Sequence, residues 1–172
     1  EIEENSELDL LVAYKAHAGD PRIPGVVADM QKEMNGGIYP DLVERMAQFE
    51  LTLLDWAEAH KGARKYVAFA DKCWPAFPEQ FGFEPCYVNS RLAARGIPVA
   101  CEVDIYGALS EYIGSCISQD AATLLDINNS VPKSMWEKSI KGKFDYELTD
   151  TFMGFHCGNT PSCKMCADRA VK

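Results

Sequence analysis

The stretch Ile97-Pro-Val-Ala-Cys-Glu-Val-Asp-Ile-Tyr-Gly-Ala-Leu-Ser-Glu-Tyr-Ile113 decides the predicted fold. Residues 97–101 form a short apolar run that is typical of a buried strand. From Ile105 onward, apolar residues recur at helical spacing, so a helix is expected directly after the strand. The turn between them carries two carboxylates, Glu102 and Asp104. We therefore expect both side chains where a strand ends and a helix begins.

Two further apolar runs, Tyr66–Ala70 and Ala122–Ile127, have the composition of buried strands. A helix is expected at 85–94, between the first two strands, and the helix from Ile105 precedes the third. Alternation of strands and helices at these lengths predicts a parallel sheet with right-handed crossovers. We therefore expect residues 1–172 to form a single α/β domain, a three-layer Rossmann-like fold whose mainly parallel sheet is flanked by helices. Ligands bind at the carboxyl ends of the strands in such sheets.

The clearest helix is predicted between residues 40 and 60. Pro40 suits the first turn of a helix, and apolar residues follow in steps of three and four. These residues are Leu42, Met46, Phe49, Leu53 and Ala57. Shorter elements are expected elsewhere: a helix at 25–34, a helix at 134–143 and a strand at 152–155, while the segment 8–14 fits either a helix or a strand.

Composition narrows the class of protein. The chain has 172 residues, a formal net charge of -9 and 47% hydrophobic residues, as soluble globular proteins do. An acidic surface lacks the positive charge that a phosphate backbone requires, so we expect no nucleic-acid partner. No apolar run is long enough to predict a membrane span. Seven cysteines are an odd number, which favours reduced thiols and a cytoplasmic location. The chain starts without methionine, and we expect it to be part of a longer protein.

Glu102 and Asp104 are the first candidates for chemistry. Two carboxylates at the binding edge of a sheet suit a hard divalent cation or general acid–base catalysis. Alternatively, Asp104 is only the N-cap of the helix that follows, because aspartate is a preferred capping residue. Glu102 is harder to explain structurally, since an acid that directly follows a buried strand is unfavourable unless it is paired.

Histidine and cysteine residues near the end of the chain give two competing metal predictions. His156, as a neutral imidazole combined with oxygen ligands, suits manganese, cobalt or a related ion. Alternatively, His156 with Cys157, Cys163 and Cys166 forms a structural zinc site, although the spacing matches no common zinc finger.

Aromatic and amide side chains offer weaker candidates for sugar contacts. A loop is expected at 71–79, after the first strand. Aromatic residues gather around this loop, either as core packing or as a stacking platform for a sugar ring. They are Trp74, Phe77, Phe81 and Phe83. Asn128, which lies between Asp126 and Asn129, is either a turn former or a hydrogen-bonding partner for hydroxyl groups.

Several segments together resemble the L-fucose/L-arabinose isomerase family. They are Lys72-Cys-Trp-Pro75, Gly96-Ile-Pro-Val-Ala-Cys-Glu-Val-Asp-Ile-Tyr-Gly-Ala-Leu109, Leu125-Asp-Ile-Asn-Asn129 and Phe155-His-Cys-Gly158. The resemblance implies that this chain is the central region of a longer, manganese-dependent aldose–ketose isomerase. It also implies a cis-enediol intermediate, a homo-oligomer in the complete protein, and little activity for this region alone.

The resemblance further assigns site residues. It makes Asp104 and His156 metal ligands, with Asp104 also placed for proton transfer. The family pattern has an acid where this sequence has Ala76, so Glu79 is taken as the third ligand and second catalytic residue, with Glu84 and Glu102 as the alternatives.

Trp74, Glu102 and Asn128 are expected to contact the sugar. Two other functions stay open: a non-catalytic zinc-stabilised interaction module, and a carbohydrate-binding module without turnover.

Overall fold

The computed structural model describes residues 1–34, 40–156 and 160–164. The described chain divides into two compact units. The first contains residues 1–123 together with 160–164, and the second contains residues 124–156. Each unit is described by itself below.

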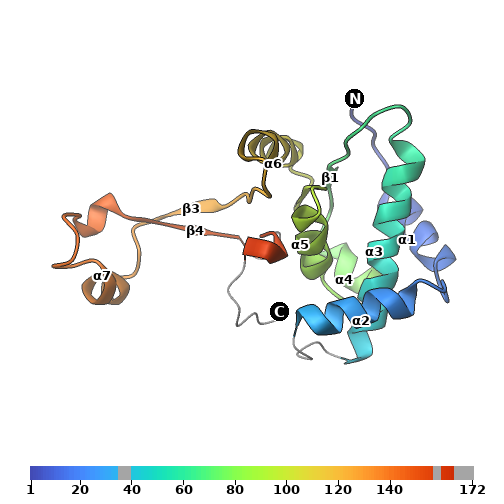
Figure 1. Ribbon diagram of the computed structural model, residues 1–172, viewed down its shortest axis with the longest axis horizontal. Coiled ribbons are helices and arrows are strands. Elements are labelled where there is room, and N and C mark those ends of the chain that lie inside the picture. Colours follow the sequence, from blue (N-terminus) through green and yellow to red (C-terminus); the bar gives the residue numbers. More distant parts are fainter. Residues whose placement is uncertain (35–39, 157–159, 165–172) are drawn as a thin grey trace. The chain divides into compact units, whose positions relative to one another are not determined.

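The first unit is built mainly from helices (Figure 1), with one short strand pair that contacts α5 and α6. Its elements are α1 (Glu7–Ala16), α2 (Ile23–Glu33), α3 (Pro40–His60), β1 (Phe69–Ala70), α4 (Ala76–Phe81), α5 (Cys86–Ala94), β2 (Val99–Ala100), α6 (Ile105–Ser118) and the 3-10 helix η2 (Ser162–Lys164). The second unit contains β3 (Asp126–Asn129), α7 (Lys133–Ser139), the 3-10 helix η1 (Leu148–Asp150) and β4 (Phe152–Phe155).

The predicted three-layer Rossmann-like α/β fold is wrong, because the described chain is mainly helical. Its first two predicted strands do pair in parallel, with Phe69 opposite Val99 and Ala70 opposite Ala100. The third predicted strand does not join them. Ala122 instead meets the end of α6, where its N–H donates to Ser115 Oγ at 3.1 Å.

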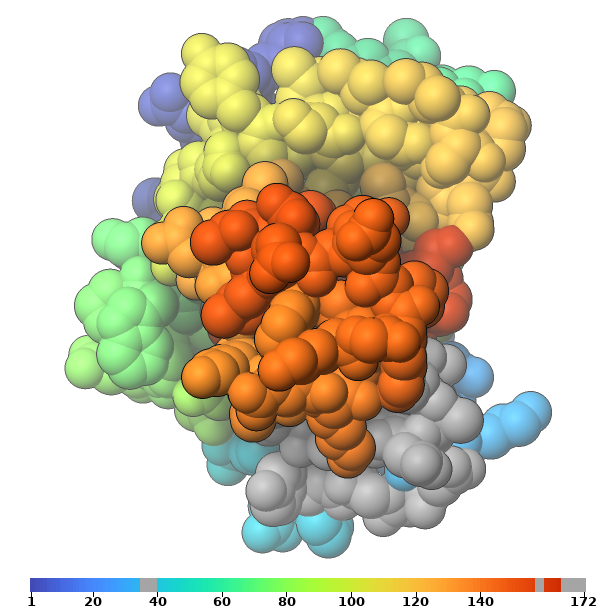
Figure 2. All heavy atoms as spheres, turned by 90° about the vertical axis from the view of Figure 1, so that its left-hand side faces the viewer, coloured from blue at the N-terminus to red at the C-terminus, as the bar shows by residue number. Residues whose placement is uncertain are grey.

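The strand that follows Ala122 belongs to the second unit. β3 pairs antiparallel with β4, and every residue of β3 is exposed. Its polar side chains explain why it does not enter a buried sheet. The second unit, drawn in shades of orange in Figure 2, also leaves large apolar side chains at its surface, including Ile127 and Phe144.

The predicted helices of the first unit are confirmed. α3 begins at Pro40 and ends at His60, and its buried residues include Met46, Phe49 and Leu53. α1 resolves the ambiguity at 8–14 in favour of a helix, since Ser6 and Asp9 form a capping box at its start. α4 differs from the prediction, because the sequence predicts a loop at 71–79 where the structure has a helix from Ala76 to Phe81.

The core of the first unit is an aromatic cluster between α3 and α4. Phe49, Phe77, Phe81 and Phe83 are each at most 4% exposed. The Phe77 and Phe81 rings stack with centroids 4.1 Å apart, and Phe49 meets the Phe77 ring edge-on. Core packing is therefore confirmed for these phenylalanines, whereas Trp74 is 65% exposed.

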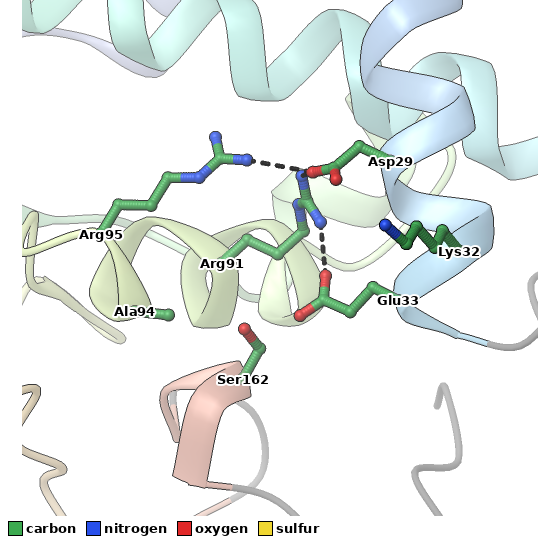
Figure 3. Close-up of a pocket in the computed structure, with 7 residues that line it drawn as sticks. All are labelled: Asp29, Lys32, Glu33, Arg91, Ala94, Arg95 and Ser162. Carbon is green, nitrogen blue, oxygen red and sulfur yellow. Dashed lines mark hydrogen bonds and ion pairs between the residues drawn. The ribbon is translucent and has the colours of Figure 1, made fainter. Parts of the chain in front are cut away.

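A buried ion network ties α2, α3 and α5 together (Figure 3). Arg91 on α5 is 4% exposed, and its Nε donates to Glu50 Oε2 at 2.6 Å. Its two Nη atoms reach Asp29, at 2.7 Å, and Glu33. Glu50 is fully buried and is also paired with Arg95. Because each buried charge has a partner, the network can be accommodated in the interior.

We expect Arg91→Met to lower the free energy of unfolding by about 3–5 kcal/mol, since it leaves Glu50 charged in the interior with one partner fewer. The matched control is Arg64→Met, which removes an exposed ion pair with Glu1 and should change stability by about 0–1 kcal/mol. Urea denaturation followed by circular dichroism measures both. Equal losses in the two variants would show that the network adds nothing to stability.

His17 links α1 to α3 through both nitrogens of its ring. Its Nδ1 lies 2.9 Å from Ala13 O and its Nε2 lies 3.0 Å from Asp55 Oδ2. Only the doubly protonated imidazole donates to both acceptors. Partial burial lowers the pKa of His17, but these two hydrogen bonds outweigh it, so the pKa is raised.

Stability from His17 should be present in full below pH of about 6.5, the usual histidine pKa, and should fall as pH rises through the raised folded pKa. We therefore expect wild-type protein to lose more stability than His17→Gln between pH 6 and pH 8.5. Thermal unfolding across this range, in constant ionic strength, measures the difference. Parallel pH profiles in the two proteins would contradict the assignment.

Candidate functional site

The candidate site lies where β1 and β2 end. The backbone ladder continues one step beyond these strands. Asp71 N–H donates to Ala100 O at 2.9 Å, and Val103 N–H donates to Asp71 O at 2.9 Å. These bonds hold the segment after β1 beside the turn that leads from β2 into α6. The carboxyl ends of parallel strands thus meet here, as in larger open sheets.

The turn from β2 into α6 has an unusual backbone. Asp104 N–H donates to Cys101 O at 3.1 Å, and the two residues between them have φ values of 58° (Glu102) and 59° (Val103). This left-handed region is disfavoured for a β-branched residue such as valine. Backbone strain of this kind concentrates at functional sites and amounts to about 1–3 kcal/mol per residue.

Asp104 caps α6, as one of the two sequence readings predicts. Its Oδ1 accepts a hydrogen bond from Gly107 N–H at 2.8 Å. The structure gives its Oδ2 no hydrogen bond within the described residues. Asp104 therefore combines a fixed orientation with an available oxygen, which is compatible with the cap and with a role in chemistry.

Glu102 does not need a buried partner, contrary to the sequence argument. The left-handed turn leaves its side chain exposed, so no burial penalty arises. Val103 next to it lines a groove of about 730 Å³, together with Ile105, Leu109 and Tyr112. The strained turn therefore borders this groove, which is larger than the pocket of about 350 Å³ beside the ion network.

A second set of side chains lies beneath the turn and was not selected from the sequence. Asp71, Cys73 and Cys101 place their donor atoms within 4.8 Å of one another. Asn89 Nδ2 donates to Asp71 Oδ2 at 2.8 Å. Burial raises the pKa of Asp71 to about 6. In the sequence, the one indication of this cluster is its position: Asp71 and Cys101 each directly follow one of the paired strands.

The residues predicted for metal binding fall in both units. Glu79 is exposed on α4, and Asp104 belongs to the same unit. His156 follows β4 in the second unit. The structure therefore does not test the set of Glu79, Asp104 and His156, and the manganese site stays a prediction.

The remaining residues predicted from the sequence to contact a sugar or zinc are divided between the two units. Trp74 is exposed between β1 and α4, which suits a sugar contact, and Asn128 is exposed in β3 of the second unit. Their sugar contacts stay predictions, as does that of Glu102. For the alternative zinc site, Cys163 is exposed in η2, whereas Cys157 and Cys166 lie outside the described residues.

The pocket beside the ion network is a weaker candidate. It measures about 350 Å³ and includes Lys32 and Ser162 besides the network residues (Figure 3). Its arginines are engaged by Asp29, Glu33 and Glu50. An anionic ligand would have to displace these carboxylates, so we interpret the network as structural.

Among the described residues, no helix combines the length and apolarity that crossing a membrane requires.

The chain has partial similarity to several sulfoquinovose isomerases. That of Alkalicoccus urumqiensis is 34% identical over 83 residues, which are 48% of this chain and 18% of the relative. That of Priestia megaterium is 32% identical over 110 residues, which are 62% of this chain and 24% of the relative. That of Clostridium sp. (strain MSTE9) is 46% identical over 48 residues, 28% of this chain and 11% of the relative. No family model matches the sequence, and no solved structure shows significant similarity.

These relatives correct the predicted family. The assignment to L-fucose/L-arabinose isomerases is wrong, because the similar proteins are named for sulfoquinovose instead. The broader prediction of a sugar isomerase agrees with the comparisons in part, because part of the chain is similar to sugar isomerases. The matched segments span at most 24% of the relatives from Alkalicoccus and Priestia.

Relief of strain in the turn gives a direct test of its geometry. We expect Val103→Asn to raise the free energy of unfolding by about 1 kcal/mol, because asparagine tolerates the left-handed region better than valine. Val103 is 51% exposed, so little packing is lost.

The control is Val12→Asn, an exposed position within α1, which should give no increase in stability. Chemical denaturation of the two variants provides the comparison. A loss of stability in Val103→Asn as large as in Val12→Asn would mean that the turn is unstrained.

Proposed function

We propose that this chain is part of an aldose–ketose isomerase that acts on sulfoquinovose. The main support for this proposal is the 32–34% sequence identity to sulfoquinovose isomerases over as much as 62% of the chain. Because the match covers at most 24% of those relatives, the rest of the active site is expected to come from other parts of the enzyme.

The chemistry of this reaction requires a positioned base. An aldose becomes a ketose when a base takes the proton from carbon 2 and a proton is delivered to carbon 1, while the proton on the carbon 2 hydroxyl moves to the carbon 1 oxygen. No net oxidation occurs. A carboxylate within hydrogen-bonding reach of these atoms supplies this general acid–base catalysis.

The turn after β2 offers two such carboxylates. Asp104 is held by its capping bond to Gly107 N–H, which leaves Oδ2 for proton transfer. Glu102 is exposed beside it and can accept a hydrogen bond from a sugar hydroxyl. The strain at Glu102 and Val103 supports this assignment, since an unstrained turn would place the side chains differently.

In this proposal, Asp104 is the one residue assigned to bind manganese. A carboxylate oxygen such as its Oδ2 is a hard donor of the kind that manganese prefers. The bound ion would supply polarisation of the sugar oxygens.

We expect Asp104→Asn to lower kcat by about 100-fold or more, the usual contribution of a general base. Asparagine is an equally good N-cap, so α6 and the stability of the protein should be preserved. The assay follows conversion of sulfoquinovose to its ketose by NMR in the complete enzyme, with residues 1–172 alone as an inactive parallel sample.

Asp145→Asn is the control, because Asp145 is exposed in the second unit. It should retain full activity. Wild-type kcat in Asp104→Asn would remove this residue from the mechanism. Absence of conversion by the complete wild-type enzyme would overturn the proposed substrate.

A further inference from the structure

We propose that Asp71, Cys73 and Cys101 form a binding site for a divalent cation of the zinc class. This inference goes beyond the proposed isomerase activity and does not depend on it. Two thiols and one carboxylate are donors that zinc accepts together.

The fold brings these residues together from distant parts of the chain. Asp71 and Cys73 follow β1, and Cys101 follows β2, so the ladder between the strands sets their separation. Their donor atoms all lie within 4.8 Å of one another. Cys73 and Cys101 are 8% and 5% exposed, which shields the thiols from solvent.

The spacing is close to that of a tetrahedral site. Zinc–sulfur bonds of about 2.3 Å and zinc–oxygen bonds of about 2.0 Å place neighbouring donors roughly 3.5–3.8 Å apart. With donor atoms no more than 4.8 Å apart, the cluster needs a contraction of roughly 1.0–1.3 Å at most, which side-chain rotation can supply. Three protein ligands leave a fourth coordination position, as in zinc sites that also bind water.

Independently of the donor spacing, the carboxylate of Asp71 supports a cation at this position. Its Oδ1 is buried and has no hydrogen-bond partner. No lysine or arginine in the described part of the chain forms an ion pair with Asp71. A buried polar atom without a partner is destabilising and is rare in native proteins. A bound cation would satisfy this oxygen.

Asn89 acts as the outer support for this ligand. Asn89 is fully buried, and its Nδ2 donates to Asp71 Oδ2 at 2.8 Å. This bond fixes the carboxylate and leaves Oδ1 for the ion. Hydrogen bonds of this kind to metal-binding side chains are a common feature of metal sites.

Both thiols must lose their protons when a metal binds. Burial raises the pKa of Cys73 and of Cys101, so without a metal the two thiols stay protonated. Metal binding would release the thiol protons to solvent, so affinity should increase with pH.

A second group of possible ligands is less suitable. His17, Asp20 and Asp55 also lie within 4.8 Å of one another. However, Arg22 already binds both carboxylates, with Nη2–oxygen distances of 2.6 Å. A cation would have to displace this arginine, whereas the cysteine cluster has no such competitor.

The test is titration of the reduced, metal-free protein with Co²⁺, which reports thiolate coordination through a sulfur-to-cobalt charge-transfer band. We expect one equivalent to give this band and Zn²⁺ to abolish it by displacement. Cys73→Ser and Cys101→Ser should each weaken Co²⁺ binding at least 100-fold. Asn89→Ala should weaken it about 10–100-fold, as loss of an outer support does.

Cys116→Ser and Cys163→Ser are the controls, because both cysteines are exposed. They should bind Co²⁺ as wild type does. If a cysteine variant fails to fold by circular dichroism, Asp71→Asn replaces it and should weaken binding at least 10-fold.

Three results would overturn the proposal. The first is the absence of a charge-transfer band in wild type. The second is a band lost in Cys163→Ser but kept in Cys73→Ser, which would move the site to the C-terminal cysteines. The third is an intact mass that shows a Cys73–Cys101 disulfide under non-reducing conditions and no metal uptake after reduction.

Discussion

The parallel pairing of Phe69–Ala70 with Val99–Ala100 is the contact on which the site depends. It is short, yet its hydrogen bonds continue through Asp71 to Val103 and so align the two segments that follow the strands. α5 and α6 both contact β2 and hold the pair in place. A small ladder covered by helices thus does what the edge of a large sheet does in open α/β folds.

The fold was predictable where a pattern acts locally. Pro40 and the apolar repeat predicted α3, and Asp104 predicted the start of α6. The sheet was not predictable, because an apolar run cannot distinguish a central strand from a short segment packed under helices. The apolar face of α6 shows the difference, since Leu109 and Ile117 are 51% and 80% exposed instead of covered by a sheet.

The site was predictable only in part, for a related reason. Carboxylates after a strand draw attention to Glu102 and Asp104, and both lie at the turn. Asp71 and Cys73 follow an equally short strand, but their proximity to Cys101 depends on the pairing register, which the sequence does not reveal. The left-handed backbone at the turn is likewise invisible in residues that normally avoid it.

In the proposed isomerase, the carboxyl ends of β1 and β2 face the reacting sugar. A crystal structure of the complete enzyme with its ketose product bound tests it most directly. In that structure, we expect the oxygens on carbons 1 and 2 to lie within hydrogen-bonding distance of the Asp104 or Glu102 carboxylate. A sugar bound elsewhere, with both carboxylates in contact only with solvent, would contradict it.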